Sequence, residues 1–107
     1  MLYIDFETKD KSYKLRLTTR NVMKLEKTLG RNPVSIFADI RNGTIPTVTD
    51  MIKVLHASLL AYYDDMTEEQ ACEVFDAWVE NGNCINDFIA VLIQIFEEAG
   101  LLEKTKN

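Results

Sequence analysis

Histidine, cysteine and glycine are scarce in this sequence, and their scarcity argues against several kinds of site. Among 107 residues there are one histidine, two cysteines and four glycines. Cys72 and Cys84 lack CxxC spacing and have no clustered histidines, so a zinc site is unsupported. The glycines occur singly, each just past the end of an expected helix, and do not form a phosphate-binding loop. We expect no metal and no cofactor, and we expect the two cysteines to be buried or half-buried thiols.

The sequence also offers little for catalysis. Acid–base and nucleophilic catalysis at neutral pH need a titrating group beside a second polar group. His56 is the only histidine and has no acid or serine three or four residues away. We interpret it as a partly exposed structural histidine at the margin of its helix. The protein is therefore predicted not to be an enzyme.

Long apolar runs are absent as well. No stretch approaches the ~20 apolar residues of a membrane-spanning helix. The opening MLYIDFE carries acids where a signal peptide carries basic residues. We therefore expect a cytoplasmic protein that does not bind a membrane. The length predicts a single domain over residues 1–107, with a β-hairpin at 2–17, a helical region at 19–100 and a frayed tail at 103–107.

The charges are distributed unevenly along the chain. Up to Lys53 there are ten lysines and arginines against six acids; from Val54 onward there are two against eleven. The two halves are therefore electrically complementary. This favours their packing on each other, head-to-tail self-association as a homo-oligomer, or separate partners for each face. The formal net charge of −5 argues against nucleic acid as a partner.

The N-terminal residues show the period of a β-hairpin. Apolar and polar residues alternate over 2–7 and again over 13–17, which predicts two antiparallel strands joined by a five-residue loop. Leu2 is placed on the inner face of the first strand. On the outer face, Asp5 and Glu7 are expected to form cross-strand ion pairs with Lys14 and Arg16.

The rest of the chain predicts helices. Residues 48–63 form the longest amphipathic stretch, with an apolar face broad enough to need neighbours on both flanks. The fold class is predicted to be α+β, mostly α: an N-terminal antiparallel β-hairpin followed by about five helices packed around a central helix at 48–63. The expected helix caps are Thr19, Asn32, Thr47 or Thr49, the Thr67–Gln70 capping box, and Asn83 or Asn86.

An acidic stripe lies on the helix that follows Thr67. Glu69, Glu73, Asp76 and Glu80 fall within about 60° of one another, opposite the apolar face, and that helix has no lysine or arginine to offset them. A solvated face is one interpretation of the stripe. The other is a contact with a basic surface on a partner or a neighbouring copy.

Two groups of apolar residues exceed what the expected core faces need. Leu60 points away from the main stripe of the central helix, with His56 and Tyr63 on the adjoining side. Val91 and Ile93 widen the apolar arc of the last helix to about 200°. Core packing is one explanation, and a groove for an amphipathic helix is the other. These five residues are our candidate partner-binding set.

Three stretches carry a family pattern. The longest is YKLRLTTRNVMKLEKTLGRNPVSIF, residues 13–37, in which a strand precedes a helix with L-E-K-x-L-G and the motif N-P-x-x-I-F. Weaker matches follow in DMIKVLHASL, residues 50–59, and DFIAVLIQIFEEAGLL, residues 87–102. Together they resemble the small tail assembly chaperones encoded by tailed phages and prophages of Gram-positive bacteria.

This resemblance implies a protein without catalytic residues that binds the tape measure protein and delivers it to tail tube subunits in the bacterial host cytoplasm. An acidic domain with spare apolar surface suits the masking of a long, aggregation-prone helical client. A small helical nucleic-acid-binding phage regulator is the alternative, because a basic edge is available on the first helix region at Arg20, Lys24, Lys27 and Arg31.

Overall fold

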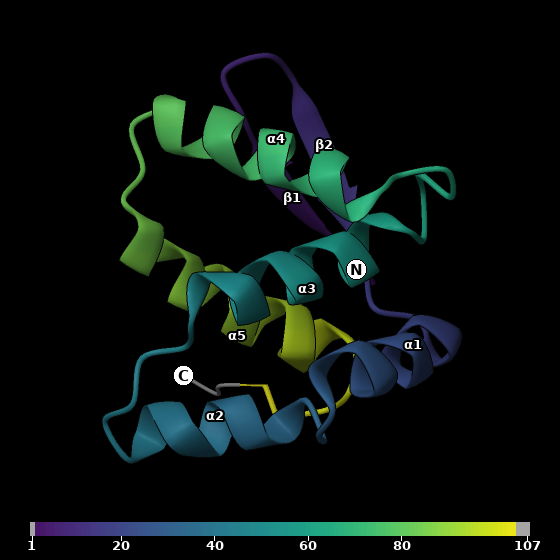
Figure 1. Cartoon of the computed structure of the whole chain (residues 1–107), viewed down its shortest axis with the longest axis vertical. Coiled ribbons are helices and arrows are strands. Elements are labelled where there is room, and N and C mark those ends of the chain that lie inside the picture. Colours follow the sequence, from purple (N-terminus) through teal and green to yellow (C-terminus); the bar gives the residue numbers. More distant parts are fainter. Residues whose placement is uncertain (1, 105–107) are drawn as a thin grey trace.

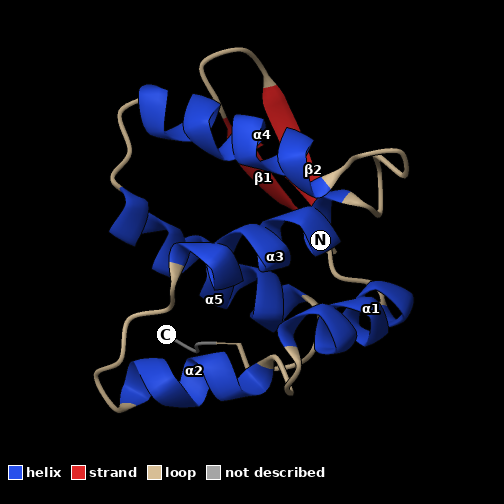
Figure 2. Cartoon of the chain, in the orientation of Figure 1, coloured by secondary structure: helices blue, strands red, loops and turns tan. Residues whose placement is uncertain are grey.

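The predicted order of a hairpin followed by five helices is confirmed. The computed structural model describes residues 2–104 (Figures 1 and 2). Strands β1 (Ile4–Glu7) and β2 (Ser12–Leu15) pair antiparallel. The helices are α1 (Thr19–Leu29), α2 (Val34–Arg41), α3 (Val48–Leu59), α4 (Glu68–Glu80) and α5 (Phe88–Glu98), and a short 3₁₀ turn, η1 (Ile85–Asp87), precedes the last of them. The fold class is therefore α+β and mostly helical.

Helix α3 lies in the middle of the molecule. Figure 1 shows α4 and the hairpin on one side of it and α1 and α2 on the other. It contacts α1, α4, α5 and β2. Its buried residues are Met51, Ile52, Val54, Leu55, Ala57, Ser58 and Leu59. An apolar arc this broad is satisfied only because neighbours cover it from several directions.

The central helix is shorter than its apolar pattern predicts. It ends at Leu59 and not at Tyr63, and Leu60 closes it. Tyr62 lies in the turn beyond the helix, where it remains 43% exposed. At the other end Thr47, the first of the two predicted caps, accepts a hydrogen bond from the amide of Asp50 at 3.0 Å.

The alternation of the hairpin is confirmed on its inner face. Phe6, Leu15 and Leu17 are buried against the helices. Leu2, which the pattern also placed inward, precedes β1 and is exposed. The loop has four residues, 8–11, because the Thr8 hydroxyl bonds to Lys11 and brings the strands together one residue earlier than expected.

The predicted cross-strand ion pairs are wrong. The register does place Asp5 opposite Lys14. However, the Lys14 ammonium lies 4.9 Å from the centre of the Tyr3 ring, and Glu7 accepts a hydrogen bond from the Ser12 hydroxyl at 3.0 Å. Among residues 2–104 no ion pair joins these acids to Lys14 or Arg16. A cation over an aromatic face competes well with an exposed ion pair, since both are worth about 1 kcal/mol or less.

Two predicted helix caps need correction. Thr18 and not Thr19 caps α1, because the extended backbone of Thr18 lets its hydroxyl accept from the amide of Asn21. At α5 neither Asn83 nor Asn86 acts as cap. The Asp87 carboxylate accepts from the amide of Cys84 at 2.8 Å, while the Asn83 side chain donates to the carbonyl of Trp78 at the end of α4.

Other predicted helix ends are confirmed. The Asn32 side chain accepts from the backbone amide of Val34, the first residue of α2, although Pro33 and not Asn32 directly precedes that helix. In α4, the backbone N–H of Gln70 donates to the Thr67 hydroxyl. The side-chain oxygen of Gln70 accepts from the backbone N–H of Thr67, which completes the capping box.

An aromatic cluster joins the hairpin to the last two helices. The ring of Phe6 stacks on Trp78 with centroids 5.2 Å apart. Phe88 meets Trp78 at 5.8 Å, Phe75 at 5.4 Å and Phe6 at 6.0 Å. Such pairs add about 0.5–1.5 kcal/mol each beyond their buried area, so the hairpin is fixed by side-chain packing as well as by its strand pairing.

The two cysteines are exposed, which contradicts the expectation of buried or half-buried thiols. Cys72 follows buried Ala71 in α4 and turns toward the acidic side of that helix. Cys84 lies in the connection between α4 and η1. At the C-terminus Leu101 and Leu102 pack back against the core, as predicted. Of the predicted frayed tail, residues 105–107 lie outside the described residues, and Lys104 pairs with Glu98 at 3.2 Å.

Arg31 ties the link after α1 to two other helices. Its guanidinium group lies 2.8 Å from the Asp39 carboxylate of α2 and 2.9 Å from the Asp50 carboxylate of α3. The hydrogen bond to Asp39 is the main cause that raises the pKa of Arg31 above its ordinary value. Arg31 is thus committed to holding the helices together.

Leu55 provides a test of the packing of α3. Because this side chain is fully buried, Leu55→Ala should lower the free energy of unfolding by about 2–5 kcal/mol in urea denaturation. Met23→Ala, at a position on α1 that is 57% exposed, is the matched control and should change it by less than about 0.5 kcal/mol. A cost below about 1 kcal/mol for the Leu55 variant would contradict the central placement of α3.

Arg31 provides a second test. Arg31→Met should lower the free energy of unfolding by about 1 kcal/mol at 50 mM salt, and by less at 1 M salt, because the pairs are partly exposed and screened. A raised arginine pKa contributes stability at every pH below the unfolded value, so the effect should be constant from pH 6 to 9. An effect that is independent of salt would argue against ion pairing.

Candidate partner-binding groove

The five predicted partner-binding residues do not form one surface. All five are half-buried. His56 and Leu60 line a groove between α1 and α3. Tyr63 lies beyond the end of α3 and faces the hairpin. Val91 and Ile93 lie on α5, where Val91 packs against the core.

The groove beside His56 and Leu60 is a hollow of about 300 Å³. One wall is formed by α1 through Lys24, Leu25, Lys27 and Thr28. The other wall is formed by α3 through Lys53, His56 and Ala57, and Leu60 and Glu68 complete the lining. Leu25 and Ala57 are buried at its floor, and Leu60 is partly exposed. The methyl group of Ala57 fills little of the space between the two helices, which leaves an apolar hollow open to solvent.

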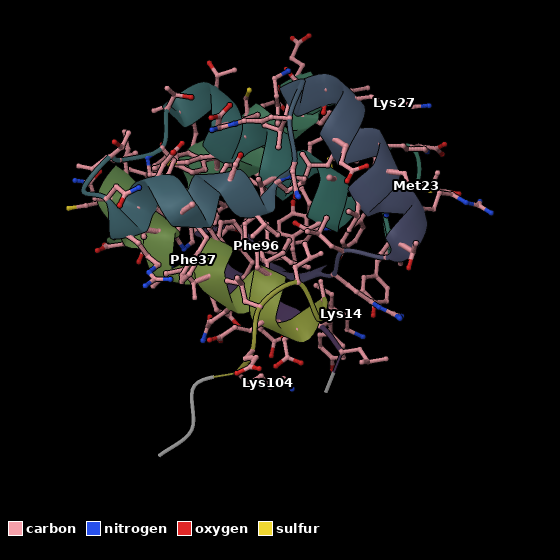
Figure 3. All side chains as sticks on the ribbon, turned by 90° about the horizontal axis from the view of Figure 1, so that it is seen from below. Lys14, Met23, Lys27, Phe37, Phe96 and Lys104 are labelled. Atoms are coloured by element: carbon pink, nitrogen blue, oxygen red, sulfur yellow. The ribbon has the colours of Figure 1, made fainter. Side chains whose placement is uncertain are left out.

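Positive charge surrounds this apolar floor. Lys53 pairs with Glu68 at 3.7 Å, so these two groups largely offset each other. Lys24 and Lys27 are exposed and form no ion pair within residues 2–104. Figure 3 shows the Lys27 side chain extending from α1 into solvent. The groove therefore combines an apolar floor with a rim of net positive charge.

His56 has a structural contact within the groove wall. Its Nε2 atom lies 2.7 Å from the carbonyl oxygen of Met66. A carbonyl only accepts, so Nε2 must carry a hydrogen and donate it. The bond ties α3 to the turn before α4. This agrees with the interpretation of His56 as a structural histidine at the helix margin.

Tyr63 is held in a second, separate hollow. Its hydroxyl accepts a hydrogen bond from the amide of Lys14 at 3.1 Å, and its ring meets that of Tyr13 edge to face at 5.5 Å. The Lys11 ammonium lies 4.6 Å from the centre of the Tyr13 ring. Acids including Glu73 line the same hollow, of about 490 Å³. Tyr63 thus fixes the hairpin to the end of α3 and does not belong to the groove.

The acidic stripe is exposed along α4. Its members are Glu69, Glu73, Asp76 and Glu80. Glu80 is 3.1 Å from the ammonium group of Lys9 in the hairpin loop, and it raises the pKa of Lys9 by accepting its hydrogen bond. A basic residue from elsewhere in the chain therefore offsets one end of the stripe, which the sequence of α4 alone did not indicate.

The fold brings together residues that were predicted to serve separate sites. Lys24 and Lys27 were predicted to form part of a basic edge for nucleic acid, and His56 and Leu60 part of a groove, while Thr28 and Ala57 carry no signal in the sequence. Only the packing of α1 on α3 makes these residues neighbours. The sequence feature that could have indicated the groove is that α1 and α3 both carry residues beside their core faces that the core does not need.

Within residues 2–104 no three potential ligands among histidine, cysteine, aspartate and glutamate gather closely enough to hold a metal ion. No helix in the same range has the length and apolar character needed to cross a bilayer.

Comparison with known proteins gives one match. A family model described as "Family of unknown function (DUF6096)" matches residues 5–107. No curated protein and no solved structure matches the chain.

The His56 contact can be tested by two substitutions. His56→Ala removes the donor to the Met66 carbonyl and should lower the free energy of unfolding by about 1–2 kcal/mol. His56→Gln supplies an amide donor and should recover part of that loss. The measurement is urea denaturation, with hydrogen exchange across residues 60–67 as the local readout. Equal stability of the alanine and glutamine variants would show that the bond does not hold the turn.

Proposed function

The chain belongs to the DUF6096 family, whose function is unknown, and we propose that it is a tail assembly chaperone of a phage or prophage. In this proposal it is a non-enzymatic protein that binds the tape measure protein in the bacterial host cytoplasm. It then helps deliver that client to the tail tube subunits, which are its second possible partner.

The groove is the observation that carries the proposal. The two stretches of sequence that form its walls, residues 13–37 and 50–59, also contribute to the resemblance to tail assembly chaperones. Lys24, Leu25, Lys27 and Thr28 come from the first stretch, and Lys53, His56 and Ala57 come from the second. A protein that masks a long helical client needs apolar surface offered to solvent, and this groove supplies it.

The size of the groove and the net charge of the protein suit such a role. The groove, of about 300 Å³, is at the lower limit of small-molecule pockets and is open to solvent, so it takes only a small part of a client's surface, such as a large apolar side chain. Burying one such side chain contributes about 1.5–3 kcal/mol, which gives weak and reversible contacts. Reversible binding is required of a chaperone that must release its client. The net charge of −5 helps to keep the chaperone itself soluble.

The alternative of a nucleic-acid-binding regulator rests on the basic edge at Arg20, Lys24, Lys27 and Arg31. Arg31 is engaged by Asp39 and Asp50, which leaves three of the four cations for phosphates. Binding through so few contacts would be strongly salt-dependent.

Co-expression with the tape measure protein of the same genome tests the proposal. We expect the client to become more soluble and to co-elute with this protein on gel filtration, because its apolar helical surface is covered. The client expressed alone, and with an unrelated acidic protein of similar size, provides the baseline.

Two results would count against the chaperone. One is a client whose solubility is unchanged and that forms no complex. The other is a shift of duplex DNA at low salt that disappears at high salt, which would support the regulator. The gene neighbourhood gives an independent check, because a tail tube gene upstream and a very long gene downstream are expected.

A further inference from the structure

The walls of the groove restrict the backbone of whatever binds there. Both walls are α-helices, whose backbone amides and carbonyls are already bonded within the helix. The lining residues belong to α1, α3, the turn at Leu60 and the first turn of α4, so the groove presents no strand edge. An extended peptide would have no backbone partner here. An occupant that satisfies its own backbone hydrogen bonds, an α-helix, fits this surface.

The floor restricts the side chain that enters. Leu25, Ala57 and Leu60 offer apolar contact, and the stems of the flanking lysines extend it. The volume of about 300 Å³ is at the lower limit of small-molecule pockets, and the hollow is open on its outer side. It suits one inserted leucine, isoleucine or methionine from a passing helix better than an enclosed ligand.

The rim restricts the charge of the occupant. Lys24 and Lys27 are one helical turn apart on α1 and are unpaired within residues 2–104. The only carboxylate in the lining is Glu68, which Lys53 already engages at 3.7 Å. Acidic residues beside the apolar anchor would pair with both free lysines and reduce the like-charge repulsion between them.

A second copy of this chain is a poorer match for the groove. Its acidic stripe has the required charge, but the exposed face of α4 at Glu69, Cys72, Glu73 and Asp76 carries no large apolar side chain to act as an anchor. Ile45 and Ile85 are exposed but lie outside the α-helices, and the exposed large apolar residues within helices are Met23 on α1 and Val48 in the first turn of α3. Within residues 2–104, the acidic helix α4 therefore lacks an exposed apolar anchor, and α1, which has Met23, carries the positive charge of the groove itself.

We propose that the groove between α1 and α3 docks an amphipathic α-helix of a partner protein, with one large apolar residue inserted over Ala57 and acidic residues paired with Lys24 and Lys27. The proposal rests on the proposed function in one respect, since the tape measure protein would supply that helix.

Synthetic peptides test the chemistry without requiring the client. The probe is a fluorescein-labelled, side-chain-stapled helix with one leucine anchor flanked by glutamates. Two matched peptides replace the glutamates by lysines or the leucine by alanine. Fluorescence anisotropy with the full-length protein should give binding of the acidic leucine peptide that is at least about 10-fold tighter than binding of either control.

Charge exchange on the protein makes the test specific. The double variant Lys24→Glu/Lys27→Glu should weaken binding of the acidic peptide by roughly 10-fold and strengthen binding of the lysine peptide. Thr28→Phe, at an exposed position that lines the groove, should weaken both by covering the floor. Arg41→Glu, an exposed charge reversal on α2 outside the groove, is the matched control and should leave binding unchanged. Circular dichroism melts establish that each variant is folded.

The outcomes separate this inference from the proposed function. Equal binding of the acidic and lysine peptides, or a double variant that binds the acidic peptide like the parent, would overturn the groove proposal. So would a client complex that survives both Thr28→Phe and the double variant, although that result would leave the chaperone function standing. If the peptides bind as expected and the double variant reverses their order, but no complex with the tape measure protein forms, the groove proposal would be supported and the tape measure protein would be rejected as the client.

Discussion

The burial of α3 is the constraint on which the rest of the structure depends. Seven of its twelve residues are buried, and α1, α4, α5 and β2 each cover part of its circumference. A helix with so broad an apolar arc cannot be stable against one neighbour, so the hairpin and the other helices are arranged around it. The groove arises from the same packing, at the seam where α1 meets α3 and the short side chain of Ala57 leaves space.

Folding pairs only some of the basic residues of the first half of the chain with acidic residues of the second half. Lys9 with Glu80 and Lys53 with Glu68 each join a cation of the first half to a carboxylate of the second. Arg31, in contrast, is paired within the first half, with Asp39 and Asp50. Two ion pairs therefore join the two halves of the chain. The exposed lysines of α1 and most of the acidic stripe remain unpaired with each other and lie on different surfaces. This residual polarity is the basis of the acidic partner proposed for the groove.

The errors of sequence reasoning are local, and each has a physical cause. Adjacent threonines at 18 and 19 offer equivalent hydroxyls, and only the backbone angles decide which one caps α1. Lys14 stands opposite Asp5, yet aromatic rings that come close only in the folded state draw its ammonium group away. Cys72 lies at the edge of an apolar face, where a small rotation of the helix decides between burial and exposure.

The sequence by itself determined the fold class, the hairpin, the five helices and most of the core faces, because the periods of two and 3.6 residues and the capping box act over a few neighbouring residues. Val48, Tyr62 and Ile85 continue the apolar patterns but are exposed, since they lie at or beyond the ends of their helices. It also selected His56 and Leu60 as residues beyond the core pattern. Only the tertiary structure brought them together with Lys24 and Lys27, and separated them from Tyr63, Val91 and Ile93. The reason is that a groove depends on how two helices pack, and that packing follows from side-chain fit among residues some 30 positions apart along the chain, which no local periodicity records.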